Sequence, residues 1–109
     1  MTVANGATFN GTTYNANGNI IGNATFSGTP DFVRSYNGGT ITGNATFNGT
    51  GINYGTINGN GIFNGTSTHD AFGTINGNAF FNDESNQNGT INGNATFDTT
   101  YYHTSAPSE

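Results

Sequence analysis

The chain has 109 residues, of which 31% are hydrophobic and only 6% are charged, and Gly alone supplies 18. This length fits a single domain, but the apolar content is too low for the thick core of an ordinary globular protein. Arg34 is the only Lys or Arg in the chain and the formal net charge is −5, which argues against binding to nucleic acid or to an anionic membrane surface.

The sequence also argues against a disordered chain, a disulfide-stabilised domain and a membrane-spanning protein. Disordered chains usually combine low hydrophobicity with few aromatic residues, whereas this chain has 9 Phe and 5 Tyr at regular positions. The chain has no Cys, so no disulfide holds the fold and the redox compartment is not indicated. No apolar run approaches the roughly 18 residues of a membrane helix, and no signal peptide follows Met1. We expect no membrane insertion; the localisation is open, with the cell surface or the extracellular space favoured.

A pair of apolar residues recurs along the chain at a fixed spacing. A branched aliphatic residue stands six positions before a Phe in every repeat, in the pairs Val3/Phe9, Ile20/Phe26, Ile41/Phe47, Ile57/Phe63, Ile75/Phe81 and Ile91/Phe97. The step from each Phe to the next aliphatic residue varies from 10 to 15 residues. A constant spacing in every unit predicts stacked coils, with Ile lying on Ile and Phe on Phe in a buried core.

The constant part of each repeat is predicted to form two short strands around a corner. In the third repeat, residues 40–42 and 45–48 alternate between apolar and polar side chains, as strands with one buried face do. By this alternation Phe47 points inward and Thr46 outward. The Gly-Asn dipeptide at 43–44 lies between the strands, where Gly accepts a positive φ without a Cβ clash.

The variable part carries a weaker signal for a third side. Five residues after each Phe come Tyr14, Asp31, Ile52, Thr68, Asn86 and Tyr102, with Phe32 or Tyr36 as alternatives in the longest repeat. A Gly then returns two positions before the aliphatic residue, as Gly18, Gly39, Gly55, Gly73 and Gly89.

These features together predict the fold class. We expect an all-β, single-domain parallel β-solenoid of about six coils, three-sided, with 16–21 residues per coil over residues 1–100, followed by a C-terminal tail or cap at 101–109. An all-β sandwich of short hairpins with Asn-Gly turns is the alternative.

The segments Gly39 to Asn48, Gly73 to Asn82 and Gly89 to Phe97 read almost alike. This pattern resembles uncharacterised bacterial and metagenomic repeat proteins, rich in Asn, Gly and Thr, whose repeats read Gly-Thr-Val/Ile-Thr/Asn-Gly-Asn-Ala-Thr-Phe-Asn. The resemblance covers most of the chain and implies a β-solenoid, but it implies no activity. A looser, architectural likeness links the chain to the self-stacking bactofilins and curli-type fibre subunits.

The sequence offers little for catalysis or metal binding. The acids, Asp31, Asp70, Asp83, Glu84, Asp98 and Glu109, fall in variable loops, after a Phe or at the C-terminus, where solvated charges are usual. Ser67, His69 and Asp70 could form a nucleophile site, but surface-loop residues are the simpler interpretation. Two His, at 69 and 103, and no Cys give no zinc spacing. We therefore expect that the protein is not an enzyme and that it binds neither a cofactor nor a metal.

Asn-x-Ser/Thr triplets begin at seven asparagines, Asn10, Asn23, Asn44, Asn48, Asn64, Asn88 and Asn94. In a eukaryotic secretory protein these would be glycan acceptors. In a repeat built of Asn, Gly and Thr we expect them to be ladder and turn residues.

These observations favour a structural or interaction module that associates with further copies of itself, head to tail or laterally, in a bacterial surface fibre or stalk. The alternative is an ice-binding protein, because a flat face of regularly spaced Thr presents methyl and hydroxyl groups to ordered water. The candidate ice-binding or partner-binding face consists of Thr2, Thr40, Thr42, Thr56, Thr74 and Thr90.

Overall fold

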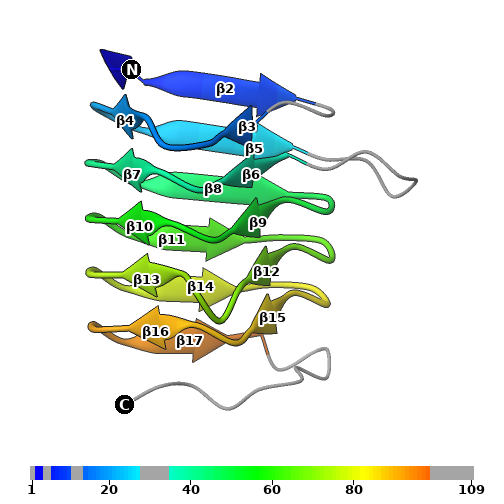
Figure 1. Cartoon of the computed structure of the whole chain (residues 1–109). Helices are drawn as coiled ribbons and strands as arrows, with labels where there is room; N and C mark the ends of the chain where they lie inside the picture. Colours follow the sequence, from blue (N-terminus) through cyan, green and yellow to red (C-terminus); the bar gives the residue numbers. More distant parts are fainter. Residues whose placement is uncertain (1, 4–5, 11–13, 28–34, 99–109) are drawn as a thin grey trace.

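The computed structural model describes residues 2–3, 6–10, 14–27 and 35–98. Within these residues the protein is all β, with 17 short strands and no helix. Figure 1 shows the strands stacked in layers, with the chain winding from one end of the stack to the other. The predicted all-β parallel solenoid is therefore confirmed, and the sandwich alternative is wrong.

The strands form three parallel sheets, and each of the first five coils supplies one strand to every sheet. The Ile sheet contains β1 (Thr2–Val3), β4 (Asn19–Ile20), β7 (Thr40–Ile41), β10 (Thr56–Ile57), β13 (Thr74–Ile75) and β16 (Thr90–Ile91). The Phe sheet contains β2 (Ala7–Asn10), β5 (Ala24–Ser27), β8 (Ala45–Asn48), β11 (Gly61–Phe63), β14 (Ala79–Phe81) and β17 (Ala95–Phe97). The amide sheet, named for its buried residues, contains β3 (Tyr14–Asn15), β6 (Tyr36–Asn37), β9 (Ile52–Asn53), β12 (Thr68–His69) and β15 (Asn86–Gln87).

The number of turns is slightly lower than the sequence predicts. The Ile and Phe sheets have six strands each, but the amide sheet has five, so the structure has about five complete turns. The third side predicted for the last repeat, at Tyr102, and the predicted tail at 101–109 lie outside the described residues.

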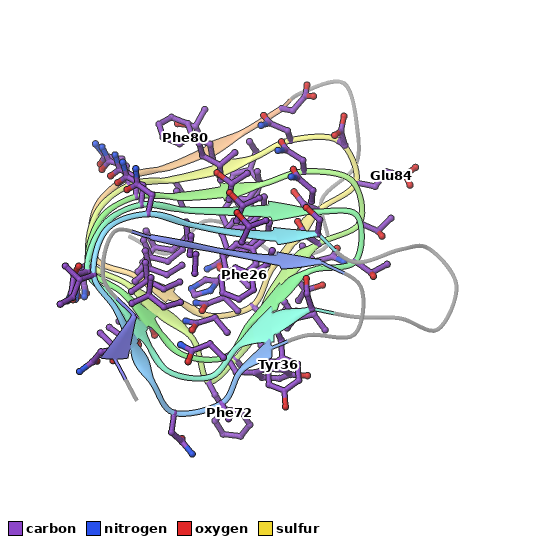
Figure 2. The ribbon with its side chains drawn as sticks, turned by 90° about the horizontal axis from the view of Figure 1, so that it is seen from above. Phe26, Tyr36, Phe72, Phe80 and Glu84 are labelled. Atoms are coloured by element: carbon purple, nitrogen blue, oxygen red, sulfur yellow. The ribbon has the colours of Figure 1, made fainter. Side chains whose placement is uncertain are left out.

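The core is a set of side-chain columns that run along the stack. Parallel pairing aligns each Ile with the Ile, and each Phe with the Phe, of the next coil. The rings of Phe26, Phe47, Phe63, Phe81 and Phe97 stack with centroids 4.8 to 5.0 Å apart. Seen down the stack, Figure 2 shows Phe26 on the inside of the coils.

Ten of the twelve predicted core residues have side chains that the structure describes, and these lie on the inner side of the coils. Ile20, Phe26, Ile41, Phe47, Ile57, Phe63, Ile75, Phe81 and Ile91 are buried, and Phe97 is partly buried against them. Val3 and Phe9 are described only as backbone, where they pair with Ile20 and Phe26. Stacking buries residues that a single coil would leave exposed, which is why the fold needs several repeats.

The corner between the Ile and Phe sheets needs Gly for a reason other than the one predicted. Of the corner glycines in the Gly-Asn repeats, only Gly22 has a positive φ, of 105°. At Gly43 the backbone is ordinary, but a Cβ would lie 2.5 Å from the carbonyl oxygen of Gly22 in the preceding coil. The close approach of successive coils therefore selects Gly there.

Candidate functional site

The inner face of the amide sheet carries a polar ladder, which is hydrogen-bonded from Asn15 to His69 and continues with Gln87 in the next coil. Its members, Asn15, Asn37, Asn53, His69 and Gln87, are all buried. The Nδ2 of Asn15 donates to the Oδ1 of Asn37 (2.8 Å), and the Nδ2 of Asn37 donates to the Oδ1 of Asn53 (3.0 Å). Buried amides are retained in proteins when such partners are available, and here the neighbouring coils supply them.

Each ladder amide also forms two hydrogen bonds to the backbone of the Gly at the next corner of its own coil. The Oδ1 of Asn53 accepts from the N–H of Gly55 (3.2 Å), while its Nδ2 donates to the carbonyl of Gly55 (3.1 Å). Gln87 makes the same pair of bonds to Gly89. These bonds fix which end of each amide faces which way, so the ladder has a single direction along the stack.

Four of the residues five positions after Phe, Tyr14, Ile52, Thr68 and Asn86, begin strands of the amide sheet, as the predicted third side requires. Ile52 is buried and Thr68 and Asn86 are half-buried, but the most enclosed residue of each strand is the following one, Asn53, His69 or Gln87. In the second repeat Tyr36, one of the two predicted alternatives, is the half-buried first residue of β6, whereas Asp31 lies outside the described residues. The missed signal was the polar residue shortly before the returning Gly.

His69 is a buried residue rather than the surface-loop residue that the sequence predicts, with an exposed fraction of 0%. Its Nδ1 lies 3.2 Å from the Nδ2 of Asn53, and its Nε2 lies 3.0 Å from the carbonyl oxygen of Thr90. An amide nitrogen only donates and a carbonyl only accepts. The ring is therefore neutral, with its proton on Nε2 and the lone pair of Nδ1 facing Asn53.

The suggested nucleophile site of Ser67, His69 and Asp70 is not assembled. Both ring nitrogens of His69 are bonded to Asn53 and Thr90. The Oγ of Ser67 is buried without a hydrogen-bond partner, and the carboxylate of Asp70 accepts from the N–H of Phe72 (3.1 Å). The geometry thus lacks the nucleophile–base and base–carboxylate contacts that such a site needs.

Asn ladders also run along the outside of the coils, as predicted for the Asn-x-Ser/Thr triplets. At the corner, the N–H of Asn44 donates to the Oδ1 of Asn23 (2.9 Å), and the N–H of Asn60 donates to the Oδ1 of Asn44 (2.8 Å). After the Phe, the Nδ2 of Asn64 donates to the Oδ1 of Asn48 (2.9 Å). These bonds link each coil only to its neighbours.

The predicted Thr face is a single column. Thr40, Thr56, Thr74 and Thr90 pair in register on the outside of the Ile sheet, and only the backbone of Thr2 is described.

No second Thr column runs beside this one. The Oγ1 of Thr42 bonds to the carbonyl of Ile20 (3.3 Å) and accepts from the N–H of Gly22 (3.1 Å). Further along, the equivalent positions are filled by an exposed amide ladder of Asn58, Asn76 and Asn92.

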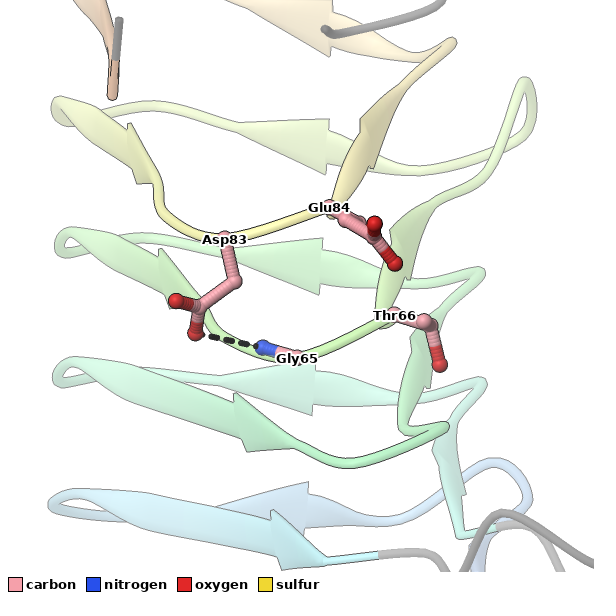
Figure 3. Close-up of a pocket in the computed structure, with 4 residues that line it drawn as sticks. All are labelled: Gly65, Thr66, Asp83 and Glu84. Atoms are coloured by element: carbon pink, nitrogen blue, oxygen red, sulfur yellow. Dashed lines mark hydrogen bonds between the residues drawn. The ribbon is translucent and has the colours of Figure 1, made fainter. Parts of the chain in front are cut away.

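A shallow hollow of about 250 Å³ lies at the corner after the Phe sheet, lined by Gly65, Thr66, Asp83 and Glu84 (Figure 3). Asp83 has a φ of 56°, the left-handed conformation that Gly65 adopts at the same corner one coil earlier. The Oδ2 of Asp83 accepts from the N–H of Gly65 (3.0 Å), which ties the two coils together. Within the described residues, no group of three or more His, Cys, Asp or Glu could hold a metal ion.

The first coil forms one end of each sheet in the part of the chain that the structure describes. Among these described residues, β1, β2 and β3 each pair with one strand only, on the side of the next coil. The N–H of Ala7 in β2 donates to the carbonyl of Asn23 in that coil (3.0 Å). Because successive N–H groups of a strand point to opposite sides, the N–H of Thr8 faces away from the stack.

Comparison with protein-family models, with curated proteins and with solved structures finds no match to this chain. Among the described residues there is no helix of the length and apolarity needed to cross a membrane.

Proposed function

We propose that the protein is a non-catalytic structural solenoid that associates with further copies of itself through the end of its stack, as part of a bacterial surface fibre or stalk. The observation that carries this proposal is the one-sided pairing of β1, β2 and β3 among the described residues. A strand edge with unpaired N–H and C=O groups is a template for another strand.

The edge of β2 has none of the features that normally prevent such pairing. Proteins protect exposed edges with charged residues, Pro or bulges, whereas β2 reads Ala-Thr-Phe-Asn. The same four-residue pattern fills β8, and β5 differs from it only at its last residue. A coil from another copy therefore presents the same columns that already stack within one chain.

The contacts inside the solenoid support an additive assembly. The Asn ladders, the Phe stack and the backbone pairing each join a coil to its immediate neighbours. In repeat proteins of this kind, stability is a sum of unit and nearest-neighbour terms, so an added coil contributes as much as an internal one.

Blocking the edge tests the proposal. We expect Thr8→Pro to remain folded and to lose association, because Pro removes the N–H that faces away from the stack without touching the bond from Ala7 to Asn23. Thr8→Val, which keeps the N–H, is the matched control and is expected to associate like the wild type. Light scattering and electron microscopy at equal concentration measure the effect, and a Thr8→Pro protein that assembles as the wild type does would refute the edge as the contact.

Ice binding is a second candidate function, favoured by the in-register column of Thr40, Thr56, Thr74 and Thr90. On the described part of the Ile sheet the column has no second Thr column beside it, because the Thr42 hydroxyl is used within the fold and an amide ladder occupies the neighbouring positions. The face is thus regular in one direction only, which is why we rank it second.

Thermal hysteresis distinguishes the two functions. If the protein is a scaffold, a millimolar solution shows no hysteresis and grows unshaped ice crystals. The double variant Thr56→Tyr/Thr74→Tyr places two large rings on the column, outside the core. Hysteresis in the wild type that disappears in this variant, with an unchanged unfolding transition, would make ice binding the function.

A further inference from the structure

The buried ladder of the amide sheet contains one residue that can change its charge near neutral pH. His69 occupies a position that Asn fills in the three preceding coils and Gln in the next. Its ring lies between Asn53 of the preceding coil and the carbonyl of Thr90 on the other side. One side chain thus connects three successive layers of the stack.

We propose that His69 is an acid-sensitive link: a proton on its Nδ1 breaks the ladder at Asn53 and opens the stack between β9 and β12. The first argument is the direction of the ladder. The Nδ2 of Asn53 points at Nδ1, so a protonated Nδ1 faces a second donor where it needs an acceptor.

The ladder cannot accommodate a protonated His69 without breaking further hydrogen bonds. Turning the amide of Asn53 would present its oxygen to the ring, but that oxygen already accepts from the Nδ2 of Asn37 and from the N–H of Gly55. Asn37 and Asn15 would have to turn as well, and each is fixed by bonds to its own corner Gly. Protonation at one residue therefore affects the polar ladder back to the first turn.

The surroundings of the ring also restrict its rotation. A Cβ on Gly73 or Gly89 would lie 2.7 or 2.6 Å from ring atoms of His69, and the Phe63 ring packs at 5.6 Å. The ring is held on all these sides, so it has no room to rotate away.

Among the described elements packed around the ring of His69, one charged side chain lies near it, that of Asp70. Asp70 is adjacent in the chain, but its carboxylate is bonded to the N–H of Phe72. The other elements around the ring, β9, β11, β15 and β16, contain no ionisable side chain.

The energetic direction agrees with this geometry. Burial lowers the pKa of His69 below the usual 6.5, and the bond to the Thr90 carbonyl and the charge of Asp70 offset this only in part. The folded state therefore prefers the neutral ring. The stability that this preference supplies is fully present above pH 6.5, and it is lost as the pH falls below 6.5 towards the pKa of the folded protein, because the opened chain binds the proton more readily.

The test compares unfolding across pH 5 to 7.5 in three proteins: wild type, His69→Asn and His103→Asn. His103→Asn removes the only other His and is the matched control. We expect the unfolding constants of the wild type and of His103→Asn to rise by up to about tenfold for each pH unit below 6.5, relative to His69→Asn. The His69→Asn protein reports the background from carboxylates.

Two measurements on the wild type keep the proposal falsifiable if His69→Asn does not fold. Nitrogen chemical shifts of the ring are expected to report a neutral ring protonated on Nε2, and a pKa below 6.5. On acidification, the amides of Thr68 and Asp70, which bond to β9 and its flanking Gly51, are expected to lose hydrogen-exchange protection before those of β14. A folded-state ring that titrates at or above pH 6.5, or parallel pH profiles for all three proteins, would overturn it.

Discussion

Replacing Phe47 with Ala is expected to destabilise the protein by about 3–5 kcal/mol, the range for buried Phe truncations. The ring of Phe47 is fully buried and stacks on Phe26 at 4.9 Å and on Phe63 at 4.8 Å, nearly parallel to both. Removing the ring leaves a cavity in the middle of the column, and Phe26 and Phe63 each lose the ring on which they stack. Urea unfolding followed by circular dichroism measures the change.

Thr46→Ala is the matched control for Phe47→Ala. Thr46 is the preceding residue of β8 and is only half-buried, on the outer face of the same strand. We expect this change to cost less than about 1 kcal/mol. Equal losses at the two positions would show that the inward and outward assignment of the strand does not govern stability.

The second large effect is expected from Gly55→Ala, at about 3 kcal/mol or more, because the added methyl group would overlap the carbonyl oxygen of Gly39 in the preceding coil. It would also lie 2.9 Å from the Nδ2 of Asn37, a member of the buried ladder. The carbonyl oxygen belongs to the backbone, and the Nδ2 of Asn37 is held by hydrogen bonds to Gly39 and Asn53, so the coils themselves must separate. The thermal unfolding midpoint of the variant should fall accordingly.

Gly61→Ala gives the control for added volume. Gly61 pairs in register with Ala45 and Ala79, so Ala completes an existing column. Its methyl group would meet the Cδ1 of Ile75 at 2.9 Å and the Cε1 of Phe63 at 3.0 Å, which are side-chain atoms that can shift. We expect a change of less than about 1 kcal/mol in either direction. A loss as large as that of Gly55→Ala would contradict the close approach of coils as the cause.

The hydrophobic half of the fold could be predicted because its signal is local. The spacing of six residues between Ile41 and Phe47 recurs in every repeat, and alternation along a strand then decides which side chains point inward. The register of the Ile and Phe sheets follows directly, since only one alignment places Ile on Ile and Phe on Phe.

The polar half could not be predicted in the same way. A hydrophobic pattern assigns buried positions to apolar residues, but Asn53 is buried because Asn37, Gly55 and His69 satisfy its amide. Two of these partners come from other coils, so their contribution is known only once the coils are stacked. His69 was misplaced for the same reason, and the two inserted residues after Asp70 made its segment resemble an ordinary loop.

The varying length of the segments after Phe limited how well the buried residue of the third side could be predicted. In the second repeat the chain takes 11 residues from Phe26 to the buried Asn37, compared with six from Phe47 to Asn53. Counting forward from Phe therefore pointed to Asp31, while counting back from Gly39 identifies Asn37. In the other four turns the buried residue follows Phe by six positions, as Asn15, Asn53, His69 and Gln87. The forward count therefore fails only in the second repeat, because loops tolerate insertions.

Sedimentation velocity of the wild-type chain over a concentration series tests the central claim, that the stack associates through its end, most directly. The exposed edge of β2 predicts that the weight-average mass rises with concentration and that the assemblies are elongated. A species with the mass of one chain at every concentration up to millimolar would contradict it.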